Sequence, residues 1–190
     1  MRGILGAITG LIVLVSTSVF AQGWAEYRNP EQGFMVNFPT DPKQETATYM
    51  TASGGSVPAR LFLSEENGNR YSMTVVEFSS RPMDDDGAAA MAHAASVLRG
   101  KGAIRFDMSS ELDGVHGHQL SMVDGNGRRI LVQLYYFNHR LYIAEGNVGP
   151  NAFEPALFQT SVAMLHPDGK IVNLNREARE RAAAEAQTQK

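Results

Sequence analysis

The stretch from residue 103 to residue 148 constrains the fold most, because four strand-like runs follow one another there with only short turns between them. The turns at 124–127 (Asp-Gly-Asn-Gly) and 138–139 (Asn-His) are tight, which is typical of an antiparallel meander. The run 130–137 is apolar on both faces, whereas a strand with one face in water alternates. Both faces of the predicted sheet therefore need cover, and we expect helices on the two sides.

Two hairpins precede this meander. The segment "WAEYRNPEQGFMVNFP" predicts two strands joined by a turn that starts at Asn29-Pro30, where Gly33 can supply a positive φ. The segment "ARLFLSEENGNRYSMTVVEF" predicts a second hairpin around Asn67-Gly68, a dipeptide that tolerates the left-handed conformations of a type I′ turn. Both segments therefore indicate strands connected by hairpins.

The spacing of apolar residues changes in "DDDGAAAMAHAASVLRGKG", which has acidic residues at its start, alanine through its body and Arg99 near its end. This pattern predicts a helix with both termini marked. Clustered carboxylates are also ligands for hard cations, so Asp84, Asp85 and Asp86 invite a divalent-cation hypothesis. We prefer the interpretation that these acids cap the free amides of the helix and oppose its dipole.

A second helix is expected from Phe153 to about Val162, with Asn151 as its cap. Phe153, Leu157 and Phe158 would supply its buried side.

The first 21 residues have the pattern of a secretory signal, since Arg2 precedes an apolar stretch at 4–15 and Val19 and Ala21 occupy the −3 and −1 positions of a cleavage site. The apolar stretch is too short to span roughly 30 Å of hydrocarbon as a stable helix. We therefore expect cleavage after Ala21, a periplasmic or secreted protein, and no stable membrane span after removal of the signal. An uncleaved membrane anchor is the alternative.

The chain contains no cysteine, so the exported domain must be stable through burial of its core, without disulfides. It is long enough for that as one domain. The formal net charge is −3, and no basic patch interleaved with aromatic residues occurs. Nothing in this balance favours nucleic acid as a partner.

Several short motifs occur in a characteristic order: "GFMVNFP", the mid-chain helix, "LDGVHGHQL", "LYYFNHRLYIAEGNVGP" and a closing helix with Phe158 and Ser161. This order resembles the PsbP-like domains of exported bacterial proteins, over most of residues 24–166. The resemblance implies an α+β protein, an α/β/α sandwich with helices on both faces of an antiparallel sheet, and a domain over residues 22–172. It implies no activity, because relatives serve as photosystem assembly subunits in plants and as a Ran-binding factor in nuclear transport.

His116 and His118 lie two positions apart and invite a metal-ligand hypothesis. In the D-G-x-x-G pattern, Gly114 and Gly117 are expected to form the turn. Val115 and His116 would then face outward at the tip of the turn. His118 is expected in the following strand, in register with Leu120 and Met122.

Zinc requires a third and usually a fourth ligand, and the other three histidines, His93, His139 and His166, are scattered along the chain. We therefore expect structural or surface histidines, with no metal and no cofactor. His116 and His118 remain the candidates for a metal site.

The sequence contains no Gly-x-Ser-x-Gly elbow, His-Glu-x-x-His helix, phosphate-binding glycine loop or cysteine nucleophile, so we expect a protein that is not an enzyme. Tyr135, Tyr136, Phe137 and Tyr142 offer two interpretations. They could line a ligand groove, because aromatic side chains with polar tips suit partly wet pockets. Alternatively, and in our preferred interpretation, they form cross-strand pairs that stabilise the sheet.

The tail at 173–190 is charged and rich in alanine, and no large apolar side chain follows Leu174. It predicts a solvated helix or a disordered end, which could also dock on a partner. The sequence as a whole favours a non-catalytic module that binds a protein or an envelope component through loops and a sheet edge. The alternative is a periplasmic domain that binds a small ligand or a metal.

Overall fold

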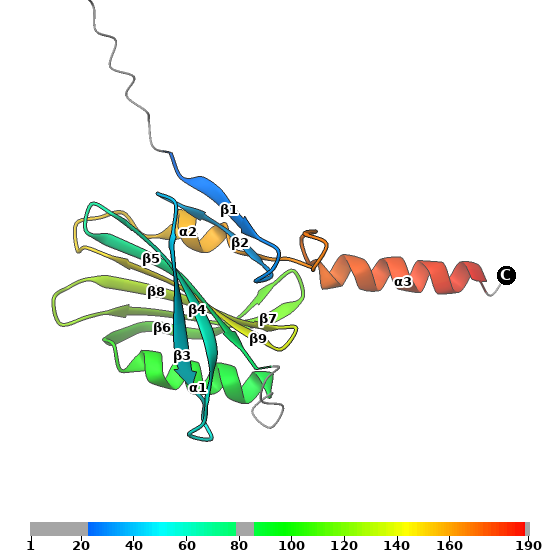
Figure 1. Cartoon of the computed structure of the whole chain (residues 1–190), viewed down its shortest axis with the longest axis horizontal. Helices are drawn as coiled ribbons and strands as arrows, with labels where there is room; N and C mark the ends of the chain where they lie inside the picture. Colours follow the sequence, from blue (N-terminus) through cyan, green and yellow to red (C-terminus); the bar gives the residue numbers. More distant parts are fainter. Residues whose placement is uncertain (1–22, 79–85, 189–190) are drawn as a thin grey trace, which may run out of the picture.

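The computed structural model describes residues 23–78 and 86–188 (Figure 1). The expected signal at 1–21 lies outside these ranges, as do Asp84 and Asp85. The elements in chain order are β1 (Ala25–Asn29), β2 (Phe34–Phe38), β3 (Lys43–Met50), β4 (Ser56–Glu66), β5 (Asn69–Glu77), α1 (Gly87–Arg99), β6 (Ala103–Leu112), β7 (Val115–Val123), β8 (Arg129–Phe137), β9 (Arg140–Val148), α2 (Ala156–Thr160), β10 (Ala163–Met164) and α3 (Leu174–Thr188).

The main sheet has seven antiparallel strands in the order β3-β4-β5-β9-β8-β7-β6. The predicted meander is confirmed, since β6 to β9 are neighbours in the order of the chain. The hairpin predicted at Asn67-Gly68 is also confirmed, because both residues have positive φ, 51° and 74°. Asn138 and His139 turn the chain between β8 and β9 in the same conformation, with φ of 50° and 59°.

One face of this sheet is covered by α1, which packs on β7, β8 and β9 (Figure 1). Small side chains on α1 let it approach the sheet closely: Ala90, Ala94 and Ala95 are buried, together with Leu98. At its start, the Asp86 carboxylate accepts hydrogen bonds from the backbone amides of residues 88 and 89 at 3.0 and 3.3 Å. The capping role predicted for the acidic cluster is therefore confirmed at Asp86.

The opposite face is covered by a second, three-stranded sheet in the order β1-β2-β10, together with the short helix α2 (Figure 1). Aromatic side chains fill the space between the layers, and Phe34 and Phe62 meet edge to face at 4.9 Å between ring centroids. Phe158 of α2 is completely buried in the same cluster. The predicted α+β class with an antiparallel sheet is confirmed, and this second face is covered largely by a second sheet, which the predicted α/β/α sandwich did not include.

The helix predicted over residues 153–162 is shorter than expected. Pro155 occupies the position before α2, and the residue that precedes a proline is disfavoured in helical conformation. The helix therefore begins only at Ala156, and Asn151 does not cap it. As a consequence Phe153 is outside the helix and 97% exposed instead of buried.

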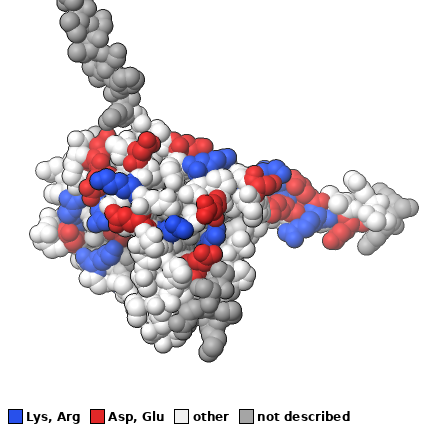
Figure 2. Space-filling view, in the orientation of Figure 1, with Lys and Arg blue, Asp and Glu red and all other residues white. Residues whose placement is uncertain are grey.

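The last helix, α3, projects away from the body of the molecule (Figure 1) and buries none of its residues. Acidic and basic side chains are interspersed on it (Figure 2). At its start the Leu174 amide donates to the Asp113 carbonyl at 2.8 Å, and Glu177 binds His166 at 2.9 Å. Leu174–Thr188 therefore forms an exposed helix. None of the helices in the described ranges combines the length and the apolar composition that a membrane span requires.

Candidate functional site

The two candidate metal ligands, His116 and His118, lie on the same face of β7. The strand alternates, so both side chains share the α1 face with Leu120 and Met122, as predicted for His118. The His118 imidazole, through Nε2, is hydrogen-bonded to Oδ1 of Asp107 on β6 at 2.6 Å. His116 is exposed and stands opposite Glu111 in the β6–β7 register.

Asp107 is shared between His118 and a guanidinium. The Nε of Arg99, in the last turn of α1, donates to Oδ2 of Asp107 at 2.6 Å, and a second donor of Arg99 reaches Oδ1 at 3.1 Å. The bond from Arg99 lowers the pKa of the Asp107 carboxyl below its ordinary value, and the bond with His118 acts in the same direction. The arrangement connects the end of α1 to the edge of the sheet.

A metal centre needs more ligands than this pair supplies. Across residues 23–78 and 86–188, no three His, Cys, Asp or Glu side chains come together in a way that could hold a metal ion. Two of the remaining histidines have partners elsewhere, because His93 bonds the Met50 carbonyl at 3.1 Å and His166 bonds Glu177.

The turn before these histidines differs from the one expected. Asp113 and Gly114 form it, with φ of 53° and 90°, and Val115 is buried in the core instead of facing outward at the tip. Gly117 lies inside β7 and takes no part in the turn. Its lack of a side chain leaves room for the ring of Tyr135 on the adjacent strand.

The aromatic strand residues form packing contacts within the layers. Tyr135 and Tyr142 stand directly opposite each other in the β8–β9 register, and both are buried. Tyr136 contacts Phe78 at 6.0 Å between ring centroids. The interpretation as sheet-stabilising residues is therefore confirmed for this cross-strand pair, and Tyr135, Tyr136, Phe137 and Tyr142 are absent from the lining of the cleft described next.

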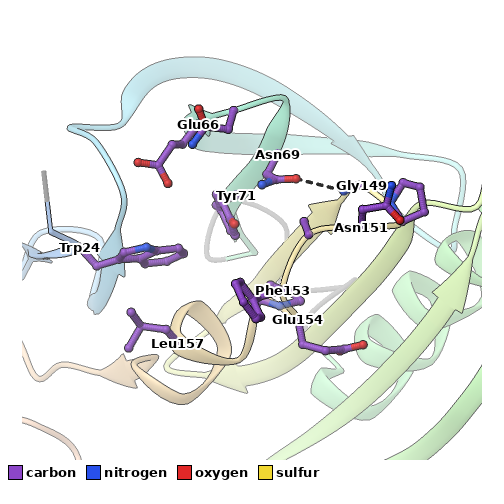
Figure 3. Close-up of a pocket in the computed structure, with 13 residues that line it drawn as sticks. Trp24, Glu66, Asn69, Tyr71, Gly149, Asn151, Phe153, Glu154 and Leu157 are labelled. Carbon is purple, nitrogen blue, oxygen red and sulfur yellow. Dashed lines mark hydrogen bonds between the residues drawn. The ribbon is translucent and has the colours of Figure 1, made fainter.

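A cleft of about 730 Å³ opens at the end of the molecule where the β4–β5 hairpin meets the loop between β9 and α2 (Figure 3). Three apolar or aromatic side chains lie around it from separate parts of the chain: Trp24 precedes β1, Tyr71 lies on β5 and Leu157 on α2. Phe153 stands in the β9–α2 loop and completes this group. Its volume is within the range of ligand pockets in proteins.

The aromatic groups of the cleft differ in how firmly they are held. Trp24 and Tyr71 meet edge to face at 4.8 Å between ring centroids, and Tyr71 is buried. Burial raises the pKa of the Tyr71 phenol, and the nearby Glu66 carboxylate raises it further. Phe153 is 97% exposed and Leu157 is 49% exposed, so the apolar surface of the α2 side is open to solvent.

Polar contacts hold the two loops that frame the cleft. The Asn69 side-chain oxygen accepts from the Gly149 amide at 3.0 Å, which connects the β4–β5 hairpin with the loop after β9 (Figure 3). Arg129 donates to the Ala152 carbonyl and to the Glu154 carboxylate, the latter at 2.8 Å. The first contact holds the backbone just before Phe153 and the second holds the side chain just after it, so Phe153 is exposed on a loop that is held in place.

The cleft was not predicted from the sequence. Trp24 belongs to an expected hairpin, and Phe153 was expected in the core because the helical pattern was extended across Pro155. Pro155 is the sequence signal that could have revealed the cleft, because it ends the helical pattern and leaves Phe153, a large aromatic residue, in a loop.

Comparison with family models, curated proteins and solved structures gave matches only among the solved structures. No family model matches the sequence. No curated protein matches it. The solution structure of cyanobacterial PsbP (CyanoP) from Synechocystis sp. PCC 6803 is similar to this chain, with 14% sequence identity, 85% of this chain and 99% of that chain covered, and a TM-score of 0.48.

Proposed function

We propose that this chain is an exported, non-catalytic module that binds a protein or an envelope component at the cleft of Trp24, Tyr71, Phe153 and Leu157. The observation that carries the proposal is Phe153, an aromatic side chain that is 97% exposed on a loop whose backbone is held by Arg129. Exposed aromatic residues beside a concave apolar surface are typical of binding sites, where aromatic anchors contribute much of the affinity.

Two further features support a binding role. The cleft combines an aromatic wall, the partly buried Trp24 and the buried Tyr71, with an exposed apolar wall, Phe153 and Leu157. Its rim carries Asn69 and Glu66, so a bound segment would place apolar groups inside and polar groups outside. The absence of catalytic motifs from the sequence favours binding over turnover.

The experiment compares capture from an envelope fraction by three forms of the protein. These are the wild type, the double variant Phe153→Ser, Leu157→Ser, and the control Val97→Ser, which changes an exposed residue on α1 far from the cleft. We expect a partner that is retained by the wild type and the control and lost by the double variant. The purified partner should also change the fluorescence of Trp24, the single tryptophan of the chain.

Two outcomes contradict the proposal. One is retention of every captured partner by the double variant with unchanged affinity. The other is turnover in a broad hydrolase screen that is abolished by substitution of a cleft residue. Export is tested separately, because mass spectrometry of the envelope protein should find Gln22 at its N-terminus.

A small ligand is the second candidate, favoured by the volume of the cleft, about 730 Å³. It predicts a change in Trp24 fluorescence with low-molecular-weight envelope extracts and no captured protein. The metal form of this candidate is tested by calorimetric titration of wild type and a His116→Ala, His118→Ala variant; equal heats would exclude it.

A further inference from the structure

Both charged side chains in the lining of the cleft are acidic. Among the described residues, the lining contains Glu66 and Glu154 and no Lys, Arg or His. Glu154 is neutralised from outside the lining, because Arg129 donates to its carboxylate at 2.8 Å. The Glu66 carboxylate has no hydrogen bond or ion pair with any residue of the ranges 23–78 and 86–188. One uncompensated negative charge therefore remains at the cleft.

The β4–β5 register places this carboxylate on the aromatic side of the hairpin. Glu66 stands opposite Asn69, and Tyr71 follows two positions later on β5, so the three side chains lie on one face. The charge of Glu66 is near enough to raise the pKa of the Tyr71 phenol. Glu65 stands opposite Arg70, and both lie on the other face of the hairpin. Glu66 is therefore directed toward the cleft and its neighbour Glu65 is not.

Three aromatic rings lie around the same opening. Figure 3 shows Trp24, Tyr71 and Phe153 about one space, with Glu66 at its rim. The face of an aromatic ring is negative because of its quadrupole, so it attracts a cation and repels an anion. Aromatic faces combined with an unpaired carboxylate therefore favour a cationic group over an anionic or a neutral one.

The rest of the cleft favours a basic side chain on a polypeptide over a small free cation. The cleft volume of about 730 Å³ is far larger than one cationic head group, since a water molecule takes up roughly 30 Å³. Leu157 adds exposed apolar surface beyond the rings. The side-chain amides of Asn67 and Asn151 have no partner among the described residues. Each amide can both donate and accept, as pairing with an extended peptide backbone requires.

We propose that the partner bound at this cleft is a polypeptide segment that inserts a basic side chain, with its cationic head at the rings of Trp24, Tyr71 and Phe153 and beside the Glu66 carboxylate. This inference rests on the proposed function, because it names the chemistry of the partner at the same cleft. A guanidinium group suits the position best, since its planar fork can stack on a ring and pair with a carboxylate at the same time.

Two peptides test the charge of the partner segment. They are the acetylated and amidated tripeptide Leu-Arg-Leu and its counterpart Leu-Gln-Leu, and Trp24, the single tryptophan of the protein, reports their binding by fluorescence. We expect the arginine peptide to bind roughly threefold to tenfold more tightly, through a cation–π contact and a partly exposed ion pair. Raising the salt from about 20 to about 300 mM should weaken only the arginine peptide.

Matched variants assign this preference to individual residues. Glu66→Gln should lose most of the preference for the arginine peptide. The control Glu65→Gln removes the same charge one position away, on the other face, and should keep the preference. Phe153→Leu keeps an apolar group but removes the aromatic face, so it should weaken the arginine peptide by roughly twofold and leave the glutamine peptide unchanged. Circular dichroism confirms that each variant is folded.

Three results overturn this inference. They are equal affinity of the wild type for the two peptides, including no binding of either up to about 10 mM, an equal preference in Glu66→Gln and Glu65→Gln, and an equal loss of both peptides in Phe153→Leu. The proposed function fails on a different result, retention of every captured envelope partner by Phe153→Ser, Leu157→Ser. The two failures are therefore distinguishable.

Discussion

The ring of Tyr135 lies over Gly117 so closely that a Cβ on this glycine would come within 2.5 Å of two ring carbons and 2.7 Å of the Leu134 carbonyl oxygen. We predict that Gly117→Ala lowers the free energy of unfolding by about 1–3 kcal/mol, because backbone and a packed ring must both move. Urea denaturation measures this change in the free energy of unfolding. The control is Gly125→Ala, where a Cβ meets no atom within 4 Å. Equal stability of the two variants would contradict this explanation of Gly117.

The shared carboxylate of Asp107 predicts a dependence of stability on pH. Its pKa is lowered in the folded protein, first by Arg99 and then by His118, so the ionised form stabilises the fold. This stabilisation is fully present above the ordinary carboxyl pKa of 3.8 and is lost as the pH falls through the lowered value. Urea midpoints of wild type and Asp107→Asn should differ near neutral pH and converge in acid. Glu45→Gln, at an exposed position on β3, should show no such convergence.

The hydroxyl of Tyr49 is buried and has no hydrogen-bond partner among the described residues, and burial raises its pKa to about 12. Tyr49→Phe should therefore leave stability unchanged or raise it by up to about 1 kcal/mol at neutral pH. Because the unfolded phenol ionises near 10, the wild type should lose stability as the pH rises above 10, and the variant should lose less.

The matched control for Tyr49 is Tyr142→Phe, whose lost hydroxyl donates to the Gln32 carbonyl at 3.2 Å. This variant should cost about 1 kcal/mol because a buried acceptor loses its donor. If Tyr49→Phe proves the more destabilising of the two in urea, its hydroxyl has a partner after all.

Helix α3 buries none of its residues, so its far part should contribute little to the stability of the body. We predict that a chain ending at Glu180 keeps the wild-type urea midpoint and loses helical signal at 222 nm. A chain ending at Asn173 should be less stable, since it also loses the contacts of Leu174 and Glu177. If the chain that ends at Glu180 is much less stable than the wild type, α3 packs on the body in solution.

The turns show why much of the main sheet could be predicted. Asn67-Gly68 and Asn138-His139 favour positive φ, and the strands they connect are neighbours in the sheet. The hairpin of β1 and β2 in the three-stranded sheet was also predicted from its turn, but its third strand was not, because β10 pairs with β2 across most of the chain. Such a pairing leaves no local pattern, and β10 has only two residues.

The candidate site was predictable only in part for the same physical reason. The side chains around the cleft come from separate segments, so no sequence spacing connects Trp24 with Phe153. His118 was placed correctly by its alternation with Leu120 and Met122. Its partner Asp107 depends on the register of β6, which includes a bulge that hydrophobic alternation does not reveal.

The projecting helix α3 also determines how this molecule moves and what it can reach. Fifteen residues of helix extend about 22 Å, most of the width of a small domain. The protein should therefore tumble and diffuse as a larger particle than its mass of 20.7 kDa would give for a sphere. Any molecule bound at the far end of α3 would be kept at a fixed distance from the body of the protein, which carries the cleft.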